Sequence, residues 1–360
     1  MRKFEISNRT VTDDSEAYLI AEIGHNHEGS LEKAEELFRR AAAAGASAVK
    51  LQKRDNKTLF TREMYEKPYT GRNSFGPTYG AHREFLEFGK HEYQRLAQLA
   101  TELGVDFFST AFDIPSVDFL VDVGIPAIKI ASADVTNTPL LTYAAKTAKS
   151  LVVSTGGATM DEVRRAVDTI LPLNERLALL QCTAVYPAAP SDLNLSVIET
   201  YRREFPDVVI GFSGHDLGNE ASCLAYTLGA RVIEKHFTLD QSSPGSDHHF
   251  SLDPALLEDL AVSLQRVRQS LGSPEKACSE REAPAVRKMA KKLVAARDLP
   301  AGHTLTADDI ACKSPGDGMK PYRLEELLGR KLREPLSTDG AFALDLLVGA
   351  ATDSGSQNAR

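Results

Sequence analysis

Short apolar runs alternate with amphipathic stretches along the first three quarters of the chain. Eight runs are rich in Val, Ile, Ala and Phe, as expected of parallel strands that are buried on both faces. These runs occupy residues 17–24, 46–52, 105–112, 126–132, 150–156, 177–183, 208–214 and 231–237. The stretches between them, such as 30–45 and 160–171, show helical spacing of apolar residues. Eight strand–helix units in succession predict an α/β fold, a closed (β/α)8 TIM barrel, with a doubly wound open sheet as the alternative.

One connection is too long for a plain strand-to-helix loop. Residues 54–83 are rich in Tyr, Gly, Pro and Arg. Long irregular loops in compact domains are usually functional or disordered. Its tyrosines, Tyr65, Tyr69 and Tyr79 with the later Tyr93, favour an ordered lid that faces a sugar. The alternative is a decoration of the surface.

The barrel pattern covers residues 1–271 and stops there. Residues 272–290 are polar and charged, which predicts a linker with a helical part. Turn signals then separate short apolar runs over 291–351 and predict a separate small domain. The polar residues 352–360 predict a flexible tail.

Composition narrows the functional class. The 360 residues carry a net charge of −8, which argues against general nucleic-acid binding. No apolar run approaches the roughly 18 residues of a membrane helix, and the N-terminus lacks the apolar core of a signal peptide. The 4 cysteines are widely spaced and predict reduced thiols in a cytoplasmic protein.

Two predicted strands end in a histidine, at GFSGHD and IEKHFTLD. Neighbouring parallel strands would bring His215 and His236 to the same rim of the barrel, where two neutral imidazoles can hold a divalent cation. Ser213 and Lys235 stand beside them and suit an anion. The alternative is a hydrogen-bonded pair of rim histidines without a metal ion.

Glu22 interrupts the first apolar strand. A carboxylate in such a position is unfavourable unless it is paired or functional, and its pKa can be tuned for proton transfer. We therefore predict a catalytic role for Glu22. The alternative is a structural ion pair with a lysine of the barrel.

Lysines and hydroxyls recur at the other strand ends. Lys50 and Lys129 interrupt apolar runs and would form a cationic floor that draws an anion into the barrel mouth. Hydroxyls at strand ends suit phosphate oxygens, and they are supplied by Thr110, Ser132 and Ser154. Alternatively, the aliphatic parts of the two lysines are buried and their ammonium groups reach solvent.

Three more residues near the strand ends have a candidate role. Tyr186 could line the pocket or simply pack against its neighbours. Asp247 could orient a hydroxyl group of the substrate. Cys182 has no base placed beside it and is expected to be a buried structural thiol.

In order along the chain, these segments resemble the sialic acid synthase family. The matching pieces are AEIGHNHEGSLEKA, AGASAVKLQ, STAFD, IKIASAD, STGG, CTAVYP, IGFSGHD and EKHFTLDQSSPGSDH. The segment LVAARDLPAG with KSPGDGM resembles the antifreeze-like (SAF, β-clip) domain that follows the barrel in this family. The resemblance covers nearly the whole chain.

The resemblance implies a reaction and assigns roles to residues. It implies condensation of phosphoenolpyruvate with an aldose such as N-acetylmannosamine, giving a 3-deoxy-2-keto sugar acid and phosphate. It also implies a domain-swapped homodimer, in which the small domain of one chain caps the partner's barrel. The implied roles are catalysis by Glu22, binding of a manganese-type ion (Mn²⁺, with Mg²⁺ or Co²⁺ as alternatives) by His215 and His236, phosphoenolpyruvate binding by Lys50, Thr110, Lys129, Ser132, Ser154 and Ser213, and sugar binding by Tyr186, Asp247 and Asp134.

Three positions depart from the family pattern. The family usually has an arginine that holds the N-acyl group of the sugar where this chain has Ser314. Asp134 stands where a glutamate is common, and Ala184 where an asparagine is often found. The phosphoenolpyruvate half of the site is intact, so the same reaction with a non-N-acylated aldehyde acceptor is the alternative.

Other classes of function stay open at this point. A Schiff-base aldolase on the same barrel would use Lys129 or Lys50 as its nucleophile. A 3-deoxy-octulosonate or heptulosonate synthase would also use phosphoenolpyruvate, but the appended domain argues against it. A carbohydrate-binding protein with a degenerate barrel would have lost ligands that this chain keeps.

Overall fold

The computed structural model describes residues 2–349 except 72 and 148, so the predicted tail at 352–360 lies outside the described residues. The chain divides into two compact units, with the division between Gly272 and Ser273. Each unit is described by itself. Among the described residues, no helix combines the length and the apolar character needed to span a membrane.

The first unit is built on eight parallel strands that close into a barrel. The strands are β3 (Tyr18–Gly24), β4 (Ala48–Lys53), β5 (Asp106–Ala111), β6 (Ala127–Ile130), β7 (Ser150–Ser154), β8 (Leu177–Cys182), β9 (Val209–Gly214) and β10 (Val232–His236). Each strand pairs with the next, and β10 pairs with β3, placing His236 opposite Glu22. This closing pair confirms the predicted TIM barrel and excludes the open sheet.

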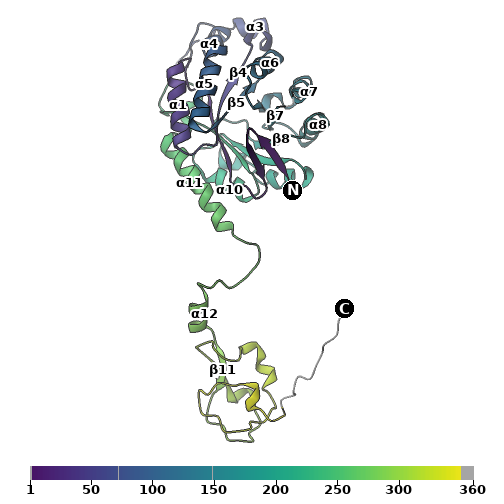
Figure 1. The fold of residues 1–360 in the computed structure, drawn as a ribbon, viewed down its shortest axis with the longest axis vertical. Coiled ribbons are helices and arrows are strands. Elements are labelled where there is room, and N and C mark those ends of the chain that lie inside the picture. Colours follow the sequence, from purple (N-terminus) through teal and green to yellow (C-terminus); the bar gives the residue numbers. More distant parts are fainter. Residues whose placement is uncertain (1, 72, 148, 350–360) are drawn as a thin grey trace. The chain divides into compact units, whose positions relative to one another are not determined.

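Helices surround the strands (Figure 1). They are α1 (Leu31–Ala43), α5 (Lys90–Leu103), α6 (Ile114–Val123), α7 (Thr138–Lys146), α8 (Met160–Ile170), α9 (Val197–Glu204), α10 (Glu220–Thr227) and α11 (Pro254–Leu271). Helix α1 begins and ends at capping residues of the expected kinds. The Ser30 side chain accepts a hydrogen bond from the Lys33 backbone N–H (3.1 Å), and Gly45 takes a positive φ of 91° just beyond the helix.

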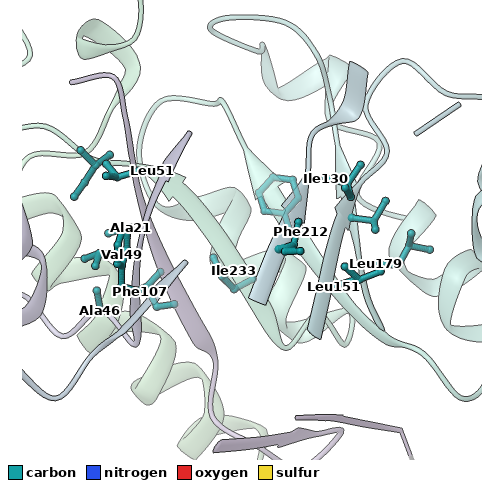
Figure 2. Packing of buried hydrophobic residues seen from close by; sticks show 14 of the residues in the cluster. Ala21, Ala46, Val49, Leu51, Phe107, Ile130, Leu151, Leu179, Phe212 and Ile233 are labelled. Atoms are coloured by element: carbon teal, nitrogen blue, oxygen red, sulfur yellow. The ribbon is translucent and has the colours of Figure 1, made fainter. Parts of the chain in front are cut away.

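Two layers of side chains follow from the alternation along each strand. One set of alternating residues, including Ala21, Val49 and Phe107, faces the helices and forms the main core; these side chains lie together in Figure 2, as do Leu151 and Leu179. The other set points into the barrel. Near the strand starts this inner set is apolar, with residues such as Ile20 and Phe108 in one buried cluster.

An N-terminal hairpin closes the amino end of the barrel. Its strands are β1 (Lys3–Ile6) and β2 (Arg9–Thr12). Phe4, Ile6 and Val11 are buried in the same cluster as the inner apolar residues of the strands. The barrel is therefore filled at this end, and a substrate can enter only from the carboxyl ends of the strands.

The long connection is ordered into short helices. These are α2 (Asn56–Leu59), α3 (Arg62–Glu66) and α4 (Tyr79–Phe85). The rings of Tyr69 and Tyr79 contact each other (5.5 Å between centroids), whereas Tyr65 packs against Gly80 and bonds Glu84. Tyr93 belongs to α5 and bonds Ser109, so it takes no part in this segment.

Short 3-10 helices complete the description. They are η1 (Ser132–Asp134), η2 (Pro190–Asp192), η3 (His248–Phe250), η4 (Ala307–Asp309), η5 (Pro321–Glu326) and η6 (Leu344–Leu346).

The second unit has its own small core. It contains α12 (Ala283–Met289) and the antiparallel pair β11 (Lys292–Ala295) and β12 (Ile310–Lys313). This core is mostly leucine and consists of Leu293, Ala295, Leu299, Leu305, Met319, Leu327, Leu332, Phe342 and Leu347. The helical part predicted within 272–290 is α12.

A buried carboxylate organises the turns of this unit. The Asp309 side chain is fully buried and accepts hydrogen bonds from Arg297 (2.6 Å to Nη2), His303 (2.9 Å) and the backbone N–H of Thr306 (2.9 Å). Burial alone would raise the pKa of Asp309, but the bonds from His303, Thr306 and Arg297 hold it well below its ordinary value. The ionised carboxylate therefore stabilises the folded unit.

We expect Asp309→Asn to destabilise this unit by about 2 kcal/mol at neutral pH, because charge-assisted hydrogen bonds are lost. Hydrogen exchange of residues 292–348 should then be faster than in the unchanged chain. A depressed pKa stabilises above the unfolded value, so the difference should begin to shrink as the pH falls below about 4. The exposed neighbour offers a control, Asp308→Asn. Equal protection in the two variants would contradict the assignment.

Candidate functional site

A cavity of about 340 Å³ opens at the carboxyl ends of the strands. Every barrel residue that the sequence assigned to the site lines it, except Asp134 and Lys235. The lining residues with a predicted role are Glu22, Lys50, Thr110, Lys129, Ser132, Ser154, Tyr186, Ser213, His215, His236 and Asp247. The structure thus brings together side chains that come from every strand of the barrel or from the loop that follows it.

The alternation of the strands decides which polar residues reach the cavity. On β10, Glu234 and His236 point inward, whereas Lys235 between them points to the helix side. The Lys235 ammonium group is buried there and contacts the Asp216 carboxylate (3.0 Å) and the Asp216 carbonyl oxygen (2.6 Å). The expectation that Lys235 suits an anion beside the histidines was therefore wrong, because successive side chains of a strand face opposite sides.

A lysine between two carboxylates forms the floor of the cavity. The Lys50 Nζ atom lies 2.5 Å from Glu22 Oε2 and 3.8 Å from Glu234 Oε2. Gln52 donates a hydrogen bond to the other Glu22 oxygen (2.6 Å). The ion pair between Glu22 and a barrel lysine, which was the alternative interpretation of Glu22, is therefore present. This ion pair does not exclude a catalytic role for Glu22.

The two carboxylates differ in acidity. Burial raises the pKa of Glu22, despite the opposing charge of Lys50. Burial acts on Glu234 in the same direction, but the combined charges of Lys50 and Lys129 and a hydrogen bond from Ser213 lower the pKa of Glu234 to about 2. Glu234 thus stays ionised, while Glu22 is the carboxylate that can take up a proton.

The second lysine lies among hydroxyl groups. Lys129 Nζ donates to Ser154 Oγ (2.6 Å), and Lys50 Nζ donates to Thr110 Oγ1 (2.9 Å). Burial lowers the pKa of Lys129. Ser132 Oγ accepts the backbone N–H of Gly156 (2.9 Å) and is held at the same wall. Two amines and several hydroxyls therefore converge on one buried space, as an anion requires.

The two predicted metal ligands face each other across the rim. The ring centroids of His215 and His236 are 5.3 Å apart. His215 Nδ1 lies 2.9 Å from the Thr183 carbonyl oxygen, so this nitrogen is the donor and the Nε2 lone pair is free. His236 Nδ1 is buried and has no hydrogen-bond partner among the described residues; the nearest carboxylate oxygen, Asp247 Oδ2, is 3.8 Å away.

The two imidazole nitrogens fit a metal ion whose remaining ligands come from substrate or water. Within the described part of the chain, no group of three or more His, Cys, Asp and Glu side chains is arranged to hold a metal ion. Burial lowers the pKa of His236, which keeps this imidazole neutral and available as a ligand. The protein would therefore contribute two nitrogen ligands.

The residues expected to bind the sugar do not share one environment. Asp247 is at the cavity, and Tyr186 stacks near His215 with half of its surface exposed (4.1 Å between rings). Asp134 is buried, accepts a hydrogen bond from Asn137 (3.0 Å) and is not among the residues that line the cavity, although its neighbours Ser132 and Ala133 are. In the second unit, Ser314 accepts a hydrogen bond from Lys291 (2.6 Å) and Lys313 pairs with Asp339.

Sequence reasoning missed several residues of the cavity. Glu234 is a carboxylate in an apolar strand, the same signal that singled out Glu22, and it has the parity of His236. Arg54 and Arg83 also line the cavity but lie at the two ends of the long connection, where no periodicity indicates direction. His25, in the loop that follows β3, lines the cavity as well. Cys182, expected to be structural, is buried and lines the cavity as well.

Comparison with known proteins agrees with the barrel and the small unit. The model of the NeuB family matches residues 37–276, and the SAF domain model matches residues 292–348. The chain is 39% identical over 323 residues to the N-acetylneuraminate-9-phosphate synthase of Mus musculus, covering 89% of this chain and 90% of that protein. It is 38% identical to the N,N'-diacetyllegionaminic acid synthase of Legionella pneumophila, and the match covers 89% of this chain and 91% of that protein.

A solved structure shows the same architecture. The N-acetylneuraminic acid synthetase of Leptospira borgpetersenii superimposes with a TM-score of 0.70 at 30% identity, covering 79% of this chain and 95% of that one. The barrel and the appended domain both agree with one family. The chain is therefore an enzyme of the NeuB family, with a SAF domain after its barrel.

Proposed function

We propose that this enzyme condenses phosphoenolpyruvate with an aldose to give a 3-deoxy-2-keto sugar acid and phosphate. The observation that carries the proposal is the convergence of Lys50 and Lys129, with their hydroxyl neighbours, beside Glu22 and the pair of rim histidines. Relatives named as synthases of N-acetylneuraminate 9-phosphate and of diacetyllegionaminic acid support a nonulosonate-type product.

The floor of the cavity suits phosphoenolpyruvate. Lys50 and Lys129 would balance its phosphate and carboxylate, and Thr110, Ser132, Ser154 and Ser213 would donate to the remaining oxygens. Both amines already have carboxylate, hydroxyl or carbonyl partners, which favours ion binding over attack on a carbonyl as a Schiff-base nucleophile. The lysines would hold the enol methylene carbon toward the rim, where the aldehyde enters.

The histidine pair supplies the other half of the site. A divalent metal ion bound by His215 and His236, with Mn²⁺ as the expected ion, would act as a Lewis acid toward the aldehyde oxygen. Asp247, at 3.8 Å from His236, would orient a sugar hydroxyl beside this position.

Glu22 is the proton acceptor of the proposed reaction. The methylene carbon of phosphoenolpyruvate would form a bond to the aldehyde carbon, which turns the aldehyde oxygen into an alkoxide and leaves a cationic centre at the former enol carbon. Water would add to this centre and pass one proton to Glu22, whose raised pKa suits the transfer, and Glu22 would return that proton to the alkoxide. The tetrahedral intermediate would then lose phosphate by C–O cleavage, with the remaining hydroxyl proton passing to the phosphate, which leaves the 2-keto acid.

The acceptor is the less specified substrate. Ser314 occupies the position where an arginine is expected to hold an N-acyl group, and a serine lacks the guanidinium fork. An acceptor without the N-acyl group is therefore the alternative within the same reaction class.

Assembly and location stay predictions. All four cysteines are free thiols, which agrees with a cytoplasmic enzyme. Exposed apolar side chains, Leu217 and Leu224, line a mostly apolar groove of about 390 Å³ beside Pro187. Such a groove on a barrel is typical of a contact surface and supports the predicted homodimer.

The proposed reaction predicts phosphate release from phosphoenolpyruvate only when an acceptor is present. A panel of N-acetylmannosamine, mannose, 6-phosphorylated and diacetamido hexoses and pentoses, each with Mn²⁺, measures this. EDTA should abolish release, and added Mn²⁺ should restore it. Release without any acceptor, or none with every acceptor, would contradict the proposal.

Glu22→Gln should lower turnover by roughly 10²–10⁴ without loss of phosphoenolpyruvate binding. Binding should persist because Glu234 still compensates Lys50. In the unchanged enzyme the acid limb of the rate profile should lie above the ordinary Glu pKa, since the proton-accepting form is lost as the pH falls through a raised pKa. Phosphate release and calorimetric titration measure the two effects; full turnover in the variant would remove Glu22 from the mechanism.

The homodimer predicts a solution mass near twice 39.2 kDa. Leu217→Asp should lower the mass measured by light scattering, because a charge in an apolar interface is unfavourable. Leu173 is exposed elsewhere on the barrel, so Leu173→Asp is the matched control. A monomeric mass for the unchanged chain would overturn the assembly.

A further inference from the structure

Asp247 lies on a loop that leaves β10 and returns to the side of the same strand. The loop, residues 239–250, contains the short 3-10 helix η3 and is otherwise irregular. At its two ends the backbone is paired: the Leu252 N–H donates to the His236 carbonyl oxygen (2.7 Å), and the Thr238 N–H donates to the Leu252 carbonyl oxygen (2.9 Å). The ends of the loop are therefore fixed beside the histidine pair, whereas the part that carries Asp247 needs other contacts to hold it.

The Asp247 carboxylate is not fixed by its own contacts. It accepts a hydrogen bond from Ser246 Oγ (2.6 Å), which belongs to the same loop, and within the described part of the chain no other element donates a hydrogen bond to it. Its contact with His236 is longer, at 3.8 Å, and 26% of its side-chain surface is exposed. The place of this carboxylate therefore depends on how the Asp247 backbone is held.

Two buried side chains hold that backbone through a chain of hydrogen bonds. Ser251 Oγ donates to the Asp247 carbonyl oxygen (2.6 Å) and accepts from Asn26 Nδ2 (3.0 Å). Asn26 Nδ2 also donates to the Phe237 carbonyl oxygen (2.8 Å), next to His236. Ser251 is fully buried and Asn26 keeps 2% of its surface exposed, so the two side chains satisfy their polar groups on each other and on the backbone. One amide group from the loop after β3 thus links Asp247 to the end of β10.

The chemistry of the groups sets the direction of this chain. The Phe237 carbonyl oxygen can only accept, which identifies the Asn26 atom beside it as the amide nitrogen. That nitrogen has two hydrogen atoms and uses one for each partner. The single Ser251 proton is therefore free for the Asp247 carbonyl oxygen, and removing the hydroxyl group would break both of its bonds at once.

We propose that Asn26 and Ser251 are positioning residues of the acceptor site, which fix Asp247 relative to the histidine pair. This inference rests on the proposed function, in which Asp247 orients a sugar hydroxyl while the histidine pair faces the aldehyde group. Neither Asn26 nor Ser251 lines the cavity at the strand ends, so both act through Asp247 rather than on the substrate. The separation between the two groups that meet the acceptor is then set by one buried amide.

Ser251→Ala tests the chain, because it removes the hydroxyl group without adding bulk. With the sugar that supports the fastest phosphate release, kcat/KM for the sugar should fall by about 10-fold or more, since a misplaced binding group weakens an oriented reaction. KM for phosphoenolpyruvate should stay unchanged, because Lys50 and Lys129 are held by other groups. An equal loss for both substrates would indicate a general defect of the fold and overturn the proposal.

A second substitution shows whether Ser251 acts through Asp247. The effect of Ser251→Ala is compared in the unchanged enzyme and in an Asp247→Ala background. If the Ser251 hydroxyl group serves to place Asp247, its removal should cost little once the Asp247 carboxylate is absent. Two losses that multiply in the double variant would contradict the proposal.

Ser222, in α10, offers a matched control. It is as fully buried as Ser251, but its hydroxyl group has no hydrogen-bond partner among the described residues. Ser222→Ala should therefore leave the kinetic constants for both substrates unchanged. A loss as large as that of Ser251→Ala would trace the effect to the removal of any buried hydroxyl group, and the positioning role would be wrong.

Hydrogen exchange keeps the chain testable if the proposed reaction fails. If the unchanged enzyme turns over no sugar, exchange of the amides in 240–250 is compared between the unchanged protein and Ser251→Ala. Faster exchange in this loop, with the barrel strands unaffected, would support the anchoring of Asp247 apart from the reaction. Equal exchange in the loop would overturn it.

Discussion

The ammonium group of Lys50, buried between Glu22 and Glu234, is the interaction on which the site depends. Three ionisable groups in a barrel interior are unfavourable unless each has a partner. Lys50 balances both carboxylates, and Glu234 in turn attracts Lys129 and accepts a hydrogen bond from Ser213. Removing Lys50 would leave the two buried carboxylates with only the charge of Lys129 to balance them. Well-packed apolar residues would fill such a space without this desolvation cost, so the cluster is weak evidence for a role in stability.

The remainder of the barrel makes such a cluster tolerable. The strand starts are packed with apolar side chains, and the N-terminal hairpin adds Phe4, Ile6 and Val11 to the same cluster. Polar groups are restricted to the carboxyl ends, where the cavity admits solvent and substrate. The helix-facing set of side chains carries most of the buried apolar area, so the polar layer inside does not have to stabilise the fold.

Charge is graded across the cavity. The floor combines two lysines with two carboxylates, and the histidine pair lies at the rim. Arg54, Arg83 and His25 line one side, where the buried Glu87 carboxylate lies 3.8 Å from His25. The floor, the rim and the arginine side therefore present different combinations of charge to a substrate.

The sequence by itself determined the barrel, the small domain and most of the cavity lining. Eight apolar runs of strand length, each ending in polar residues such as Lys50, Thr110 or His215, are local signals. Because a parallel barrel brings the carboxyl ends of all its strands to one rim, these signals also predict that the polar residues lie together. Tertiary structure decided which neighbours turn inward. Lys235 faces the helices and Glu234 joins the floor, because successive side chains of a strand face opposite sides. Asp134 lies in the 3-10 helix η1 after β6, where strand alternation gives no direction, and it does not line the cavity. The tertiary structure also placed Arg54 and Arg83 at the cavity. The long connection that carries them has no regular pattern of apolar residues, so its sequence does not indicate where their side chains point.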